Sequence, residues 1–590
     1  MAFGILEIKA EHHVAGTVLL DQRAAHSEAV TNPLKHGRGK DDNIILAPQP
    51  SEDPNDPLNW SNPKKYAVFA IIAFGTLFIV SVAVVAHKVH RPQGGMLSPG
   101  LIRISMDLKQ SPTAISKLSG YMQLASGATG PFISAWARKC GKRPVYLLSS
   151  VLGLIGCIIG ECATGYNQLV AARVIQGIAS AAYESLVLSS VGDLFFVHER
   201  APLMALVILV WTAATVAVSI IAGPITTNLG WKYNFHILMP LLAVQTIAAI
   251  FFMPETVYRR DAIYEIDVLG SDEDLQKLGY VEHRHQRRQR KDNDIKVQED
   301  GKDERDVAEA ENAELGRTTT SATTASTIPP PKTWLQQMAV YNGIFVQDSI
   351  LKMVIACPAI LLNLSALWAV FAYGSSVCWQ ITTAVMASIF FAGPPYLYTT
   401  AQIGYTSVGS MIGALLACLI MGIIADPITK AMSRRNRGVF EPEFHLPMVF
   451  VGSAFAIAGM IGEGHAITQA QSVYLICFCW GLNSFGLGVI AISVNTYILA
   501  AFRNYSTEIF IMAMVFRSFV GYGIADVIVD WYMSAGPVQI FDITAGIVGA
   551  FCLLSVPLYV FGKRYRSYWQ HHNLIKILNL ETDKTGTEDA

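Results

Sequence analysis

Charged residues are scarce in this chain of 590 residues, at 15% against 52% for hydrophobic residues. From Met353 to Ala425 there is no Asp, Glu, Lys, Arg or His, and the segments 66–86 and 543–562 are also uncharged. An uncharged run of about 20 residues is long enough to cross roughly 30 Å of hydrocarbon as a helix. The composition therefore excludes an ordinary soluble protein, and we expect a lipid bilayer around the chain.

Motifs of several other function classes are also missing. The nine cysteines have no zinc-type spacing, so we expect no metal and no cofactor. A formal net charge of -1 provides no basic field for nucleic acid. No HExxH or GxSxG sequence points to an enzyme, and no GxxxxGKS/T loop points to an ATP-driven pump.

Apolar runs of helix length occur in two groups of six, separated by a charged stretch that is too poor in large apolar residues to fold. The predicted spans are 66–86, 114–136, 145–163, 168–191, 202–223 and 233–253, followed by 353–373, 401–425, 446–462, 472–498, 508–530 and 541–562. We therefore expect an all-α membrane protein with twelve transmembrane helices in two halves. Its predicted parts are a cytosolic tail at 1–65, halves at 66–254 and 351–562, a largely disordered cytosolic linker at 255–350, and a second cytosolic tail at 563–590.

Lys and Arg in the short loops orient these spans. They gather in loops that are cytosolic when both termini are inside, such as the loops with Arg138 and Lys139 and with Arg434 and Arg435. The first outer loop departs from this bias. We expect an even number of spans and a multi-pass protein of the plasma membrane, with a vacuolar or other internal membrane as the alternative.

Seven short motifs lie in order along the predicted spans. They are DPNDPLNWSNPKKY at 53–66, GKRPVY at 141–146, ARVIQG at 172–177, VGDLFFVHER at 191–200, NLGWKYNF at 228–235, PET at 254–256 and RRNRGVFEPEFHL at 434–446. With them the chain resembles the major facilitator superfamily, and within it the fungal drug:proton antiporter type with twelve spans. The resemblance implies two halves that alternate access around a midplane site. It also implies an organic small-molecule substrate and protons as the coupling ion, and we expect a monomer.

The resemblance assigns conformational gating to a few loop residues. Lys142 and Arg143 match the basic loop of the family, which contacts helix ends or an acidic residue in one of the two states. Asp426 keeps the corresponding acidic position in the second half, and Gly223 and Pro224 match a bend in the fifth span. The alternative for the charged residues is that they only orient the spans.

Charges inside the fourth span suggest a pathway. Arg173, Gln176, Ser180 and Glu184 follow helical spacing and share one face. A charge in hydrocarbon costs at least a few kcal/mol, so such residues usually face a bundle interior or a water-filled cavity. Arg173 matches the signature Arg that the resemblance associates with proton coupling. Glu184 is expected to contact substrate or proton, or else to make a structural hydrogen bond, and Arg517 is its expected counterpart in the second half.

Aromatic residues supply candidate walls for a pocket that accepts a flat or amphipathic ligand. They are Tyr183, Trp211, Trp368, Tyr373 and Tyr522. Membrane interfaces and ordinary packing also use such residues, and that alternative stays open for each of them.

These observations predict a secondary active transporter that moves an organic small molecule by alternating access, in proton-coupled efflux of a drug-like or secondary metabolite. An uptake permease for an organic cation or nutrient is the first alternative, because Glu184 would suit a cationic group. A membrane receptor that transports nothing is the distant one. The sequence names neither the substrate nor the direction.

Overall fold

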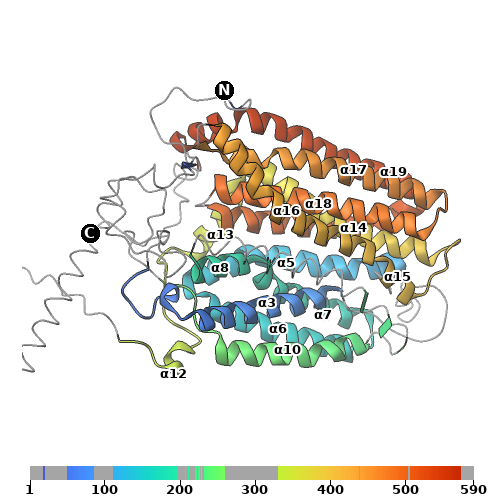
Figure 1. Cartoon of the computed structure of the whole chain (residues 1–590). Coiled ribbons are helices and arrows are strands. Elements are labelled where there is room, and N and C mark those ends of the chain that lie inside the picture. The colour runs from blue at the N-terminus through green and yellow to red at the C-terminus, as the bar shows by residue number, and fades with distance from the viewer. Residues whose placement is uncertain are drawn as a thin grey trace, which may run out of the picture.

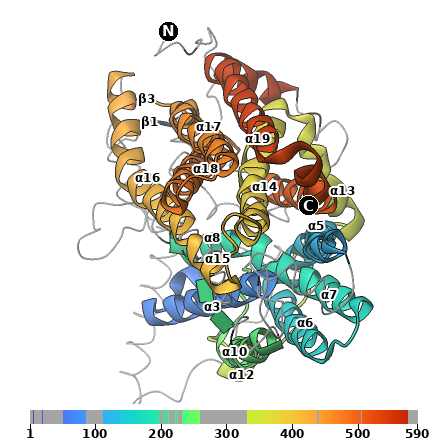
Figure 2. The same cartoon turned by 90° about the vertical axis from the view of Figure 1, so that its right-hand side faces the viewer.

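The computed structural model describes residues 50–84, 111–196, 232–258, 330–436, 439–502 and 505–572, together with Ile5, Val18–Leu19 and a few isolated positions. Most of these residues are helical, which confirms the predicted all-α class. Figure 1 shows long helices lying side by side and roughly parallel. In the view of Figure 2 they form two groups, the first half in blue to green and the second half in yellow to red.

The first half begins with a helix whose observed bounds lie within a few residues of the predicted span at 66–86. Its described helices are α3 (Asn62–Val84), α5 (Pro112–Cys140), α6 (Lys142–Cys162), α7 (Tyr166–Ser185), α8 (Val187–Leu194) and α10 (Lys232–Phe252). The Ser111 hydroxyl caps α5 by accepting from the Ala114 amide at 3.1 Å. At the other end of α5, Gly141 has a φ of 99°, which favours glycine and turns the chain directly into α6.

Both ends of the predicted linker are ordered against the first half. The short helices η2 (Pro57–Asn59) and α12 (Trp334–Gln337) lie here. Tyr258 donates to an Asp53 carboxylate oxygen at 2.7 Å, and Lys64 donates to Gln337 at 2.7 Å. Burial raises the pKa of the Tyr258 phenol, and the Asp53 carboxylate raises it further. Only the central part of the linker, 259–329, lies outside the described residues.

The described helices of the second half include short elements between the long ones. They are α13 (Ile350–Ala359), η3 (Ile360–Leu362), α14 (Leu364–Ala392), α15 (Thr400–Thr406), α16 (Val408–Arg435), η4 (Pro442–His445), α17 (Pro447–Thr468), α18 (Val473–Ala501) and α19 (Ser506–His571). Helix α19 comprises two helices joined at Gly536, whose φ of 76° is not helical. A two-stranded antiparallel sheet pairs β1 (Val18–Leu19) with β3 (Val439–Phe440).

The span predicted at 353–373 contains a sharp bend. Residues 350–362 and 364–380 meet at an angle of 96°. Asn363 at the corner accepts from the amides of Ser365 and Ala366, at 3.0 and 3.2 Å, and so starts α14 as a new helix. Because the region has no charges, hydropathy alone could not show that a corner divides it.

Among the described helices, seven are long and apolar enough to cross a membrane, or eight if the bent pair counts as one span. Every predicted span except the fifth overlaps a described helix or one half of α19. The fifth, at 202–223, lies outside the described residues apart from isolated positions. The count of twelve therefore stays a prediction.

Candidate functional site

An ion pair joins the two halves in the interior of the helix bundle. The Glu184 carboxylate on α7 contacts the Arg517 guanidinium on α19. Their side chains are 11% and 6% exposed. Removing a charge from water costs several kcal/mol unless a partner compensates for it, so each group makes the burial of the other tolerable. The expected counterpart of Glu184 thus lies directly against it.

The rest of the polar stripe on α7 lies within the first half. Arg173 is 1% exposed and donates to the Gln176 side-chain oxygen at 3.2 Å. The Ser180 hydroxyl donates to the Gly177 carbonyl at 3.0 Å. A Cβ at Gly177 would collide with the Met122 backbone, so α5 and α7 are in close contact here. From this stripe, Glu184 contacts Arg517 of the second half.

Two more ion pairs connect the halves along the contact between α5 and α19. Lys117 Nζ lies 2.5 Å from Asp526, and Arg138 Nη1 lies 2.9 Å from Glu508. Between them a Cβ at Gly127 would lie 2.7 Å from the facing α19 side chain, so the two helices approach closely along this contact. These pairs were not predicted from the sequence, because their partners are far apart along the chain.

Two of the aromatic candidates pack inside the separate halves. The Tyr183 hydroxyl lies 2.8 Å from the Ser150 hydroxyl, and the residue is 1% exposed. The Trp368 indole donates to the Phe551 carbonyl at 3.2 Å. In this conformation, both positions match the packing alternative.

The other two described candidates lie where the halves meet. The Tyr373 phenol interacts electrostatically with Arg517 and with Glu184. The Tyr522 ring on α19 lies 5.9 Å, between centroids, from the Tyr121 ring on α5. A ligand that separated the halves would therefore meet both aromatic rings.

The end of the first half that is predicted to face the cytosol carries a cluster that we call the first clamp: Lys142, Arg143, Asp193 and Glu255. Lys142 Nζ lies 2.5 Å from Asp193 Oδ2. The Glu255 carboxylate accepts from the amides of Lys142 and Arg143, at 3.0 and 3.1 Å. Arg143 also donates to carbonyls at the end of α10, including that of Ile250 at 2.9 Å. These partners are of the predicted kind, a helix terminus and an acidic residue.

The end of the second half that is predicted to face the cytosol carries the second clamp: Glu441, Glu443, Lys563 and Arg566. Arg566 binds Glu441 at 3.0 Å and Glu443 at 2.8 Å, and Lys563 binds Glu441 at 2.5 Å. Burial alone would lower the pKa of the Arg566 guanidinium, but the two carboxylates outweigh burial and raise it. The side chains of Glu441, Glu443 and Arg566 are at most 4% exposed.

The remaining predicted residues stay predictions. Asp426 lies on α16, but its side chain is outside the described part of the chain. Trp211 and Gly223 lie outside it too, and Pro224 is one of the isolated positions. Among the residues that the structure describes, no cluster of His, Cys, Asp or Glu side chains could hold a metal ion.

The carboxylates of both clamps lie in motifs that the sequence does show, yet their role was missed. Asp193 is in the motif at 191–200, Glu255 in the PET motif, and Glu441 and Glu443 in the motif at 434–446. A useful signal was available, since each acid adjoins a helix end in a loop assigned to the cytosol. Its partner is distant in sequence, however, and only the fold brings the two together.

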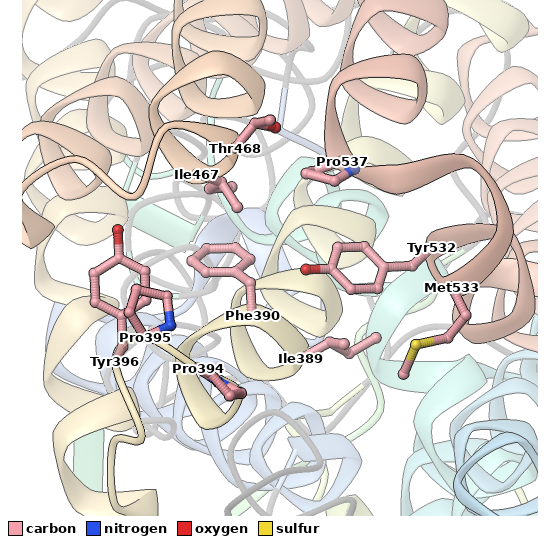
Figure 3. A pocket seen from close by; sticks show the side chains of 11 residues that line it. Ile389, Phe390, Pro394, Pro395, Tyr396, Ile467, Thr468, Tyr532, Met533 and Pro537 are labelled. Carbon is pink, nitrogen blue, oxygen red and sulfur yellow. The ribbon is translucent and has the colours of Figure 1, made fainter.

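A pocket of about 340 Å³ opens at the other end of the second half, where α14, α17 and α19 meet. Figure 3 shows Ile467 above the Phe390 ring, with the Tyr532 ring extending toward Phe390 from the other side. Tyr532 is fifteen residues beyond Arg517 on α19, which is about 22 Å at 1.5 Å per residue. The pocket is therefore separate from the Glu184–Arg517 pair.

Comparison with known proteins extends this description. The family model described as Major Facilitator Superfamily matches residues 66–526. Protein HOL1 of Saccharomyces cerevisiae is 23% identical over 560 residues, which cover 91% of this chain and 92% of that protein. Efflux pump radE of Floropilus chiversii is 22% identical over 536 residues, covering 90% and 86% of the two chains.

A solved structure supports the fold. The xylose transporter XylE from E. coli, in a partially occluded inward-open conformation, aligns with a TM-score of 0.51 at 10% identity. The alignment covers 83% of this chain and 97% of that one. At this identity the likeness concerns the fold alone.

Proposed function

This chain belongs to the major facilitator superfamily, and we propose that within this family of secondary transporters it exports an organic small molecule in exchange for protons. Multi-pass insertion in a membrane follows from the family and from the apolar helices. The efflux direction draws support from the name of the Floropilus chiversii relative. The plasma membrane is the proposed location.

The Glu184–Arg517 pair carries this proposal. It connects α7 of the first half with α19 of the second, and both groups are nearly buried. A proton on Glu184 would cancel its charge and weaken the link between the halves. Arg517 would then be available to attract the carboxylate again once the proton leaves. Proton binding would thereby bias the equilibrium between two arrangements of the halves.

The same carboxylate favours a cationic or amphipathic substrate. A positively charged group could replace Arg517 beside Glu184, with the Tyr373 phenol close to both. Competition between substrate and proton for one carboxylate would give exchange, because each would have to leave before the other binds. This argument applies equally to uptake, so direction needs its own test.

Glu184→Gln tests the coupling. The amide keeps the shape of the side chain but takes no charge, so we expect normal membrane targeting and transport reduced about tenfold, in the range of typical coupling free energies of 1–3 kcal/mol. The pH dependence of the remaining transport should flatten. Wild-type rate together with wild-type pH dependence would remove Glu184 from the mechanism.

Glu508→Gln is the matched control. It neutralises another carboxylate that bridges the halves, through Arg138, with a side chain 7% exposed. We expect its transport to keep the wild-type pH dependence. An equal flattening in both variants would mean that contact between the halves, and not proton binding at Glu184, sets the pH response.

Direction is tested in whole cells. Overproducing cells should accumulate less of an exported compound, and collapsing the proton gradient should remove the difference. Greater accumulation in overproducing cells would support uptake. A difference that survives uncoupling in full would exclude protons as the driving ion.

A further inference from the structure

Another acidic side chain lies in the interior of the second half, away from the Glu184–Arg517 pair and from both clamps. Glu463 on α17 is 0% exposed, and neither of its carboxylate oxygens has a hydrogen-bond donor. In the described part of the chain no Lys, Arg or His side chain forms an ion pair with it, whereas Glu184, Glu441 and Glu443 each have such a partner. An ionised carboxylate in this position would pay the full cost of leaving water.

The nearest polar group is the side-chain amide of Asn483 on α18. Its nitrogen is directed to the Thr383 hydroxyl on α14, at 3.5 Å, and its oxygen also lacks a donor. In this arrangement the two carboxylate oxygens of Glu463 and the amide oxygen of Asn483 all lack a donor. Rotating the amide would give Glu463 one hydrogen bond but no positive charge. One proton on the carboxyl group would supply the missing donor and remove the charge.

Close helix contact keeps water away from this group. One turn before Glu463, a Cβ at Gly459 would collide with the Asn483 backbone. At Gly462 a Cβ would lie 3.0 Å from the Cys479 sulfur, and at Gly464 it would lie 3.0 Å from the Phe541 side chain of α19. Helices α18 and α19 therefore both close over α17 at the level of the carboxyl group.

The surrounding groups offer no counter-charge. On α18 the titratable groups that interact with Glu463 are the thiols of Cys477 and Cys479. Helix α19 presents Phe541 and Val538 to the neighbouring Gly464, and α14 presents a hydroxyl. Among the residues that the structure describes, the carboxyl group thus has only neutral side chains around it.

The pocket of Figure 3 lies close to Glu463 along α17. Ile467 lies one helical turn further along the same face of α17, about 6 Å at 1.5 Å per residue, and it lines the pocket. Since the pocket lies at the end of α17 away from the second clamp, it faces the side opposite the cytosol in the predicted topology. A proton could reach Glu463 from that side by passing Ile467.

We propose that Glu463 is a proton-binding site of the second half, protonated in this conformation and exchanging its proton with the outer face through the pocket beside Ile467. Asn483 accepts the hydrogen bond of the protonated carboxyl group. The site is distinct from the Glu184–Arg517 pair, and proton binding there does not depend on whether Glu184 couples transport.

Infrared spectroscopy of the full-length protein in lipid bilayers tests the protonation state. At neutral pH, wild type should show the C=O stretching band of a protonated carboxyl group, and Glu463→Gln should lack it. The control Glu161→Gln, on a partly exposed carboxylate that contacts His236, should keep the band. A wild-type spectrum without the band, or a band that survives in Glu463→Gln, would overturn the proposal.

Two further variants keep the test decisive. If Glu463→Gln does not fold, Glu463→Asp retains a carboxyl group and should shift the frequency of the band without removing it. An unshifted band would assign it to another residue. For the path, Ile467→Trp should slow the shift of the band in deuterated water several-fold by narrowing the way to the pocket. An unchanged exchange rate would refute this path.

Discussion

The two clamps occupy corresponding places in the two halves but carry opposite signs. In the first clamp the basic residues Lys142 and Arg143 follow the second predicted span of the half, and the acid Glu255 follows its last span. In the second clamp the loop after the second predicted span supplies the acids Glu441 and Glu443, and the last helix carries the basic Arg566. The pairing of these two segments is thus kept while their charges are exchanged.

The two clamps also differ in burial. Asp193 in the first clamp is 29% exposed, whereas Glu441 and Glu443 in the second clamp are at most 1% exposed. Water therefore reaches the Asp193 carboxylate of the first clamp but not the two carboxylates of the second. In both clamps a loop charge meets a partner of opposite charge at a neighbouring helix end. The contribution of such a pair to stability depends on how deeply the partner is buried.

The largest effect should come from removing the cation of the second clamp. Arg566→Met leaves two buried carboxylates with Lys563 alone, so we expect a loss of about 3–5 kcal/mol of unfolding free energy. Denaturation in detergent mixtures, followed by tryptophan fluorescence, measures it. The control is Arg564→Met, two residues earlier on the same helix and exposed. Equal losses in the two variants would contradict the assignment of the second clamp as the drier cluster.

Replacing a cation of the first clamp by Met should lower the unfolding free energy by less. Lys142→Met leaves Asp193 partly hydrated and leaves the backbone hydrogen bonds to Glu255 in place, so we expect a loss of about 1 kcal/mol, as for partly exposed ion pairs. The same denaturation assay applies. A loss as large as that of Arg566→Met would remove the energetic difference between the clamps and leave only the difference in sign.

Much of the fold followed from the sequence because a bilayer makes hydropathy informative. An uncharged run has to be a helix, and its length fixes the span. Hydropathy was uninformative at two places in the second half. At Asn363 an uncharged corner looked like the middle of a span, and at Glu463 a buried carboxyl group looked like the end of one, since the predicted span stopped at 462 while α17 continues to Thr468.

The candidate site was less accessible to sequence reasoning. Helical spacing placed Glu184 on a polar face, and the cost of its charge required some partner. The pairing with Arg517 is a contact between residues 333 positions apart. Likewise Lys142 was recognised from its motif, but Asp193 and Glu255 became its neighbours only through packing of α8 and α10 against α6. Charge patterns identify residues that need partners, and the tertiary fold decides which partners they find.

The smallest expected effect concerns the pH response of the first clamp. Burial raises the pKa of the Glu255 carboxyl above 4.5, although backbone amides and Lys142 oppose the shift. A raised pKa in the folded state means that between 4.5 and the raised value the folded protein binds more protons than the unfolded chain does. Stability from this group is then fully present below pH 4.5 and is lost as the pH rises through the folded pKa.

Glu255→Gln cannot titrate, so the difference between wild type and this variant isolates the contribution. We expect the melting temperature of wild type minus that of Glu255→Gln to fall as the pH rises from 4.5 through the raised pKa, and then to level off. A difference that grows over this interval would mean that Lys142 and the backbone amides outweigh burial. The first clamp would then behave as a fully compensated ion cluster, as the second does through Arg566, and exposure would no longer distinguish the two.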